Sequence, residues 1–137
     1  MGKIKASETQ KKHSLKRQQP SVNYNNNVPI FSLEKLQEGK YCLSGLDKED
    51  KASFADSLFK RKSLSWSQIQ QADKHGLGTE KISKAAINAE MPKFVTADFK
   101  DFLVFRYSGK KAMVGYRKKD VFFILWFDHN FQLYNHS

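Results

Sequence analysis

Hydrophobic residues in the middle of the chain recur with a helical period. Within residues 47–62, Leu58 follows Phe54 at a spacing of four, and Phe59 follows Ala55 in the same way. This spacing places the apolar side chains on one face of an α-helix. Acids open the segment and bases close it, which matches the charge preference of the two helix ends. We therefore expect a helix over this segment.

A second helix carries the clearest local signals in the chain. Ser65 and Gln68, three positions apart, form a capping box, and Leu64 and Ile69 form the matching hydrophobic staple. Farther on, two basic residues precede Gly76, an order typical of a helix C-terminus. The signals predict a helix that begins after Ser65 and is ended by Gly76.

After residue 100 the apolar positions change to the pattern of β-strands. The runs "DFLVFRYSG", "KKAMVGYRKKD" and "VFFILWFDHN" are rich in aromatic and β-branched residues, and Gly109 and the pair Lys119 and Asp120 mark turns between them. The third run is apolar on both faces, so we expect it in the centre of a sheet. A short last strand is expected in "FQLY" and an early one at residues 41–46. The predicted fold is α+β: a strand, two helices, then a twisted antiparallel meander of three to four strands.

Residues 1–27 differ in composition from the rest. They are rich in Gln and Asn and hold six of the 24 Lys and Arg of the chain but only one of its 14 acids. A segment this polar cannot bury enough apolar surface to offset the entropy that it loses on ordering. We therefore expect a disordered basic leader. It is either a solubilising tail or an arm for nucleic acid. Residues 28–137 are expected to form a single α+β domain.

Composition also excludes several kinds of protein. Cys42 is the only cysteine, so neither an internal disulfide nor a cysteine zinc cluster is possible. The longest apolar run is seven residues, which predicts no membrane span, and we expect a cytoplasmic protein. The chain lacks a P-loop, a dinucleotide fingerprint after a strand, G-x-S-x-G and HExxH. Asp128, His129 and His136 would make a poor metal cage at a strand end and a terminus, so we expect neither metal nor cofactor.

Cationic side chains are the remaining candidates for chemistry. The formal net charge is +10, which favours an anionic partner. Arg106 interrupts an apolar strand, and it could share a face with Arg117 if the two strands pair around Gly109. Tyr134 and His136 follow near the end of the chain. The alternative is structural: Arg106 on a solvated face of an antiparallel sheet, Tyr134 as a core residue of an edge strand, and His136 as a solvated terminal residue.

Metal-independent RNA cleavage needs only the residue types found in this region. A base takes the proton of the 2′-hydroxyl group, an acid protonates the leaving oxygen, and cations hold the charge on the phosphate. Loops and turns add further candidate nucleic-acid contacts: His75, Lys81, Lys110, Lys111, Lys118 and Lys119. The turn lysines have an equally simple interpretation as solvated loop tips, and the loop with His75 and Lys81 as a structural connection.

The predicted element order resembles that of the RelE/ParE superfamily of small bacterial toxins. The segments "LSWSQIQQADKHGLGTEKI" and "FRYSGKKAMVGYRKKDVFFILWFDHNFQLYNH" resemble a small bacterial and phage-associated family of toxin-like proteins. The resemblance covers residues 30–136. It implies a twisted antiparallel sheet with two helices packed on it. It also implies catalytic roles for Arg106, Arg117, Tyr134 and His136.

Members of this superfamily cleave mRNA on the ribosome or poison DNA gyrase, and an antitoxin holds them in check. We therefore expect a toxin-like protein that acts on RNA, as a ribosome-dependent endoribonuclease of a toxin–antitoxin or phage-defence system. Its expected partners are RNA or the ribosome and a cognate antitoxin protein. Two alternatives remain open: a non-catalytic nucleic-acid or ribosome-binding module, and an inhibitor of a host enzyme such as gyrase.

Overall fold

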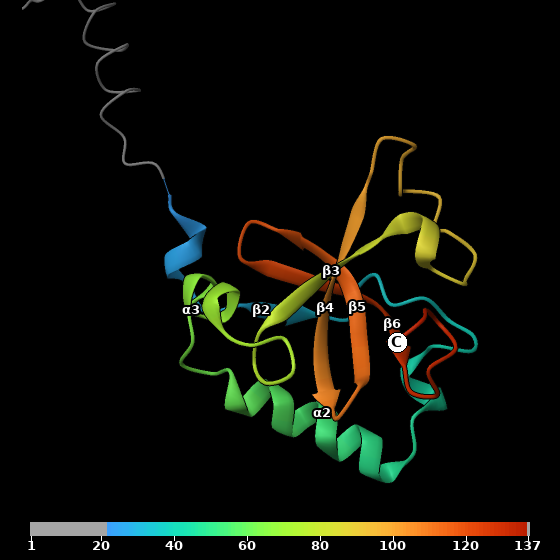
Figure 1. Ribbon diagram of the computed structural model, residues 1–137, viewed down its shortest axis with the longest axis horizontal. Coiled ribbons are helices and arrows are strands. Elements are labelled where there is room, and N and C mark those ends of the chain that lie inside the picture. The colour runs from blue at the N-terminus through green and yellow to red at the C-terminus, as the bar shows by residue number, and fades with distance from the viewer. Residues whose placement is uncertain (1–21, 137) are drawn as a thin grey trace, which may run out of the picture.

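The centre of the fold is a five-stranded mixed sheet, seen in a computed structural model that describes residues 22–136 (Figure 1). The predicted meander is present as three antiparallel neighbours, and one more strand is added at each edge. The order across the sheet is β2-β6-β5-β4-β3. The strands are β2 (Ile30–Ser32), β3 (Thr79–Ser83), β4 (Asp101–Ser108), β5 (Lys111–Lys118) and β6 (Val121–Asp128).

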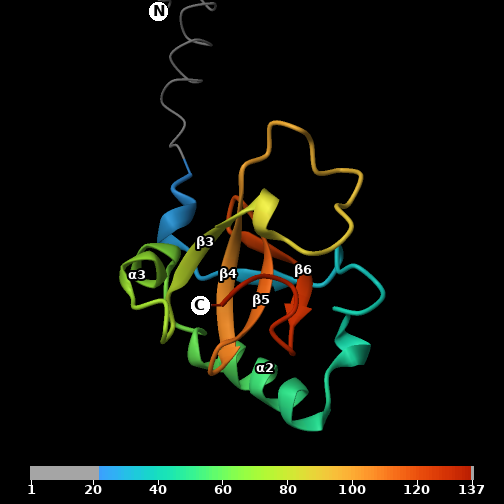
Figure 2. The same ribbon diagram turned by 45° about the vertical axis from the view of Figure 1, so that its right-hand side comes forward.

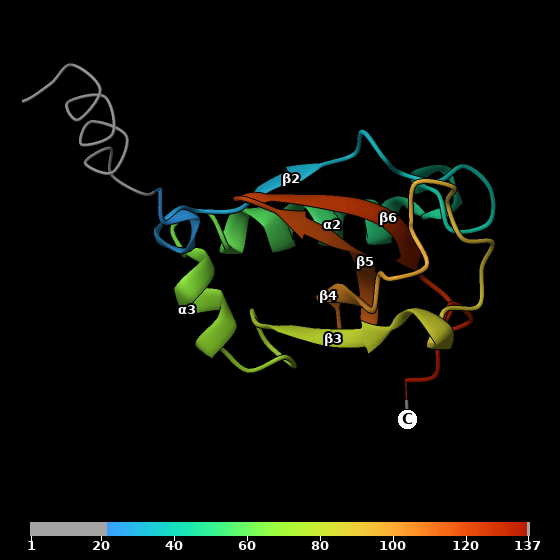
Figure 3. The ribbon, with the colours of Figure 1, turned by 90° about the horizontal axis from the view of Figure 1, so that it is seen from above.

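The predicted α+β class is confirmed, but the topology is not a simple meander. β2 pairs in parallel with β6, and β3 pairs antiparallel with β4 at the other edge (Figure 3). The apolar run of β6 lies between two strands, as its composition predicts. Neither edge strand was predicted, because each is short and depends on a partner far away in the sequence.

Two predicted strands are absent. Residues 41–46 form a turn with a 3-10 helix, η2 (Leu43–Gly45), in which Tyr41 and Leu46 are buried as the two anchors of the turn. The segment "FQLY" is irregular for two reasons. Phe131 has a φ of 62°, and the carboxylate of Asp128 accepts from the backbone N–H groups of Gln132 and Leu133. In both places apolar residues anchor a turn instead of pairing in a strand.

Both predicted helices are present. Helix α2 (Lys48–Lys60) is capped by Asp47, whose carboxylate accepts from the N–H of Asp50 at 2.7 Å. Helix α3 (Trp66–Gln71) has the predicted capping box between Ser65 and Gln68. Figure 2 shows α2 and α3 beside the sheet. No helix within residues 22–136 has the length and apolar content needed to cross a membrane.

The end of the second helix was predicted at the wrong place. α3 stops at Gln71, and a turn follows in which the carbonyl of Asp73 accepts from the N–H groups of Gly76 and Gly78, both at 2.9 Å. A Cβ on Gly78 would lie 2.2 Å from the carbonyl oxygen of Ala72, whereas one on Gly76 would meet nothing closer than 3.6 Å. The indispensable glycine is therefore Gly78, which permits a close backbone approach.

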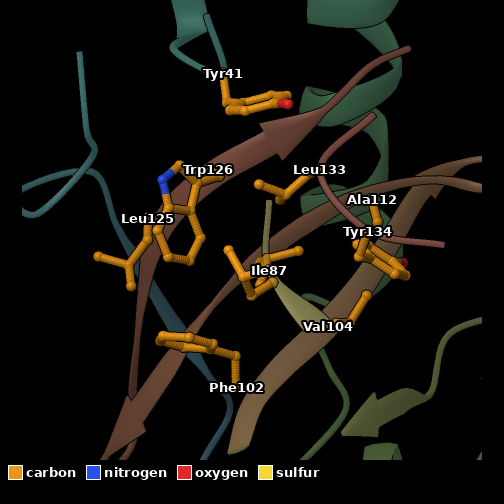
Figure 4. Packing of buried hydrophobic residues seen from close by; sticks show 10 residues of the cluster. Tyr41, Ile87, Phe102, Val104, Ala112, Leu125, Trp126, Leu133 and Tyr134 are labelled. Carbon is orange, nitrogen blue, oxygen red and sulfur yellow. The ribbon is translucent and has the colours of Figure 1, made fainter. Parts of the chain in front are cut away.

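Each face of the sheet has its own core. On the Trp66 face, named after its buried tryptophan, α2 and α3 cover Phe105, Phe122 and Phe127. On the Trp126 face, the loop after β3 and the C-terminal segment cover Phe102 and Val104 (Figure 4). The further buried members of the Trp126 core are Tyr41, Ile87, Ala112, Val114, Leu125, Leu133 and Tyr134. Alternate residues of β4 thus enter different cores.

The folded part begins before residue 28, the predicted start. Asn23 caps the 3-10 helix η1 (Tyr24–Asn26), and the carbonyl of Asn27 accepts from the N–H of Trp66 at 2.9 Å. The side chain of Asn27 donates to Asp120 at 3.1 Å. Polar side chains here make caps and hydrogen bonds, a use that the low apolar content did not reveal. Residues 1–21 of the predicted leader lie outside the described residues.

Candidate functional site

Arg106 and Arg117 lie on opposite faces of the sheet, so the expectation that they share a face is wrong. Arg106 pairs with Ala112 across the hairpin and follows the Trp126-face residues of β4. Arg117 is five positions after Ala112, and an odd separation along a strand reverses the face. Its guanidinium accordingly lies over the ring of Trp66, 4.1 Å from the ring centroid.

Arg117 is held in a structural role. Its Nε donates to the carbonyl of Lys119 and its Nη2 to Oδ1 of Asn25, each at 2.7 Å. Burial lowers the pKa of Arg117. The side chain connects the β5–β6 turn, helix α3 and the N-terminal segment, so its donors are directed at the protein itself. A catalytic role for Arg117, which the resemblance implied, has no support in this geometry.

The other three candidate catalytic residues lie together. A cavity of about 250 Å³, here called the Arg106 cavity, opens between the loop after α3, the β4–β5 turn and the C-terminal segment. It brings together Arg106, Tyr134 and His136 with two of the predicted nucleic-acid contacts, His75 and Lys110. The complete lining is Lys74, His75, Glu80, Arg106, Lys110, Tyr134, Asn135 and His136.

Arg106 is only partly neutralised by its neighbours. Its Nη1 lies 2.7 Å from Nδ1 of His75, and its Nη2 lies 3.5 Å from Oε1 of Glu80. Lys74 contacts the same carboxylate, also at 3.5 Å. Charge-assisted hydrogen bonds are usually about 2.7–2.9 Å long, so both ion pairs are loose. Arg106 retains capacity to bind an anion.

His136, which lines the cavity, forms a pair with Asp128, which does not. Asp128, fully buried at the end of β6, accepts at Oδ1 from the N–H groups of Gln132 and Leu133, at 3.0 and 3.1 Å. Its Oδ2 contacts Nε2 of His136. The imidazole is stacked on the ring of Tyr134, with centroids 4.0 Å apart and planes inclined by 22°. From the sequence, Asp128 was considered only as part of a poor metal site. The short separation of eight residues between Asp128 and His136 was the signal that the two side chains could meet.

Several residues that line this cavity carry an unpaired polar atom. Within residues 22–136, four buried side-chain nitrogen or oxygen atoms have no hydrogen-bond partner. Three of them belong to cavity residues: Nε of Arg106, the hydroxyl of Tyr134 and Nδ1 of His136. Burial raises the pKa of Tyr134 well above its usual value, so the phenol keeps its proton at neutral pH. Because an unmade buried hydrogen bond costs about 1–3 kcal/mol, a ligand that supplied the missing partners would be stabilised here.

The remaining predicted contacts lie elsewhere. Lys111 forms an ion pair with Asp50 of α2 at 2.8 Å, and this hydrogen bond raises the pKa of Lys111. Lys118 and Lys119 lie at the β5–β6 turn, and Lys81 pairs with Leu103 on the Trp66 side of the sheet. These four lysines do not contribute to the Arg106 cavity.

Residues 22–136 hold no group of three or more potential metal ligands. The ring of His129, considered for a metal site together with Asp128 and His136, contacts the carbonyl of Lys40 instead, at 3.1 Å. His129 therefore does not join the Asp–His pair.

Arg61, which the sequence analysis missed, holds in place the loop and the strand that contribute residues to the cavity. It is 1% exposed and donates to the carbonyls of Leu77, Ser57, Gly76 and Arg106 at 3.0–3.4 Å. Burial lowers its pKa to about 10. Arg61 thus fastens the loop that carries His75 to α2 and β4. It continues the apolar stripe of Phe54 and Leu58 at helical spacing, and that position was the signal for its burial.

Comparisons of the chain with protein-family models, with curated proteins and with solved structures found no match. The resemblance to the RelE/ParE superfamily stays a prediction, and the functional argument rests on the Arg106 cavity.

Proposed function

We propose that the protein is a toxin-like endoribonuclease that binds an RNA backbone phosphate in the Arg106 cavity and cleaves the adjacent bond without a metal. The observation that carries this proposal is the convergence of Arg106, Tyr134 and His136, each with an unpaired buried polar atom, on one small cavity. The three come from β4 and the C-terminal segment, with His75 added from the loop after α3. This chemistry requires neither a nucleophilic side chain nor a metal, because the nucleophile is the 2′-hydroxyl group of the RNA itself.

The residues fit the steps of RNA transesterification. A base takes the proton of the 2′-hydroxyl group, the O2′ atom attacks phosphorus, and the bond from phosphorus to O5′ breaks. The products are a 2′,3′-cyclic phosphate and a 5′-hydroxyl group that has received a proton. In this proposal His136 acts as the base, and Arg106 and Tyr134 donate to the phosphate oxygens. His75 accepts at Nδ1 from the guanidinium of Arg106 and so helps to orient it, and O5′ takes its proton from solvent at the exposed side of the cavity.

The size and charge of the site support a backbone linkage as its ligand. Pockets that enclose a drug-sized molecule measure roughly 300–1,000 Å³, and this cavity is smaller, at about 250 Å³. It therefore has room for a phosphate and part of a sugar while the bases stay outside. The formal charge of +10 favours association with a polyanion.

The test is cleavage of a labelled RNA by the purified protein, with and without ribosomes, in the presence of a metal chelator. We expect 2′,3′-cyclic phosphate ends, and a loss of activity of about 10²–10⁴-fold in His136→Gln. His129→Gln is the matched control, because it makes the same change in a histidine outside the cavity.

The outcomes separate the alternatives. RNA binding that depends on Arg106 without any cleavage would favour a non-catalytic nucleic-acid or ribosome-binding module. Growth arrest with intact RNA and broken DNA would favour an inhibitor of gyrase. Either result would overturn the proposed activity.

A further inference from the structure

We infer that Asp128 is a positioning residue that presents Nδ1 of His136 to the 2′-hydroxyl group of a ribose, and that this contact restricts the Arg106 cavity to RNA. The inference rests on the proposed function for the reaction that follows. The recognition itself, a ribose hydroxyl beside a phosphate, is a statement about binding and is tested without catalysis.

The hydrogen bonds of Asp128 determine which nitrogen of His136 carries the proton. Oδ1 already accepts from two backbone N–H groups, those of Gln132 and Leu133. A carboxylate surrounded by N–H donors acts as an acceptor, so Oδ2 accepts from Nε2 of His136. The neutral imidazole then has its hydrogen on Nε2 and a lone pair on Nδ1.

The surroundings prevent the ring from flipping, which would put Cε1 in the place of Nε2 and Cδ2 in the place of Nδ1. One face of the imidazole is stacked on Tyr134, and Phe131 meets it edge-on at 5.0 Å between centroids. Asn88 fastens the same segment: its N–H donates to the carbonyl of Leu133 at 2.6 Å and its side chain to that of Gln132 at 3.2 Å. A ring flip would break the contact with Asp128 and disturb this packing.

The three unpaired atoms define the ligand. Nε of Arg106 and the hydroxyl of Tyr134 are donors suited to phosphate oxygens, whereas Nδ1 of His136 is an acceptor and needs a donor. A ribose with a 3′-phosphate supplies both: anionic oxygens and, on the neighbouring carbon, a hydroxyl hydrogen. Deoxyribose lacks the hydroxyl group and would leave Nδ1 without a partner. The 2′-hydroxyl is the feature by which proteins distinguish RNA from DNA.

The first experiment uses the unaltered protein and two probes, adenosine 3′-monophosphate and 2′-deoxyadenosine 3′-monophosphate. Long-range ¹H–¹⁵N NMR spectra identify the tautomer of His136, whose signals are assigned from their loss in His136→Gln. We expect the Nε2–H tautomer in the free protein. We also expect binding of the ribonucleotide about 10-fold tighter than that of the deoxynucleotide, as one hydrogen bond of roughly 1.4 kcal/mol would give, with a shift at Nδ1.

The second experiment is the variant Asp128→Asn. The asparagine oxygen can keep both backbone N–H groups, but its NH₂ group faces Nε2 and moves the ring hydrogen to Nδ1. We expect this change of tautomer, loss of the preference for ribose, a rise in KM of no more than about 10-fold from the lost hydrogen bond, and a larger fall in kcat of about 10²-fold or more. Circular dichroism verifies folding; if the variant does not fold, the two probes on the unaltered protein still decide.

The results distinguish this inference from the proposed function. Equal affinity for the two nucleotides, or an Nδ1–H tautomer in the free protein, would overturn the positioning role even if RNA is cleaved. The expected tautomer and ribose preference in a protein that cleaves no RNA would support the inference and refute the proposed activity.

Discussion

Replacement of Arg61 by alanine tests how the scaffold holds the candidate site. Four charge-assisted hydrogen bonds to carbonyls are lost, at roughly 1.5–3 kcal/mol each. At the lower end of that range they contribute roughly 6 kcal/mol. Burial opposes this gain: the fall of the Arg61 pKa from 12.5 to about 10 corresponds to a cost of roughly 3 kcal/mol at 1.36 kcal/mol per unit. We therefore expect Arg61→Ala to lower the free energy of unfolding by about 3 kcal/mol.

Urea unfolding followed by tryptophan fluorescence measures this loss. With a slope of about 2 kcal/mol/M, 3 kcal/mol moves the midpoint down by about 1.5 M. Lys60→Ala is the control, because it removes an exposed neighbouring charge from the same helix. Arg61→Met keeps much of the packing on Phe105, over which the guanidinium lies at 4.9 Å, and should fall between the two. An unchanged midpoint in Arg61→Ala, or full stability in Arg61→Met, would refute the role assigned to the carbonyl contacts.

Three further experiments with point variants test other parts of the structure. Gly78→Ala should destabilise by about 2 kcal/mol or more because its Cβ would lie 2.2 Å from a backbone oxygen, whereas Gly76→Ala should be nearly neutral; thermal unfolding compares them, and equal losses would contradict the turn geometry. The raised pKa of Tyr134 means that the folded protein keeps a proton which the unfolded chain loses near pH 10. Stability from this group is present below pH 10 and lost as the pH rises above it, so Tyr134→Phe should flatten the fall of urea stability in alkali. Lys110→Ala should reduce the salt dependence of RNA binding by about one phosphate contact, while Lys118→Ala, at the opposite turn, should not; equal slopes would argue against the Arg106 cavity as the RNA site.

Local signals in the sequence predicted the elements that depend on local physics. The capping box of Ser65 and Gln68, and the aromatic runs of β4, β5 and β6, are sufficient because their partners are neighbours in sequence. The parallel pairing of β2 with β6 joins Ile30 to Val121 and has no local signature. The edge strands were missed for this reason, whereas the two strands wrongly expected contain apolar residues that anchor turns.

The candidate site was predicted by residue type and corrected by geometry. Arg106 was selected because it interrupts an apolar strand, and Tyr134 and His136 because their side chains suit phosphate chemistry; the fold does bring the three together. The residues that orient them were missed. Asp128 and Arg61 are buried, and their hydrogen-bond partners are set by chain folding, so their positions in the sequence indicated their burial or proximity but not these partners.

The hydrogen bond between Arg117 and Asn25 changes how the basic leader should be removed. A deletion through residue 27 would take away Asn25 and also Asn27, whose carbonyl accepts from the backbone N–H of Trp66. A loss of activity in such a shortened chain would report damage to the domain as much as the absence of a cationic arm. A deletion of residues 1–21 alone leaves the hydrogen bonds of Asn25 and Asn27 intact, so that a change in activity reports the loss of the cationic segment itself.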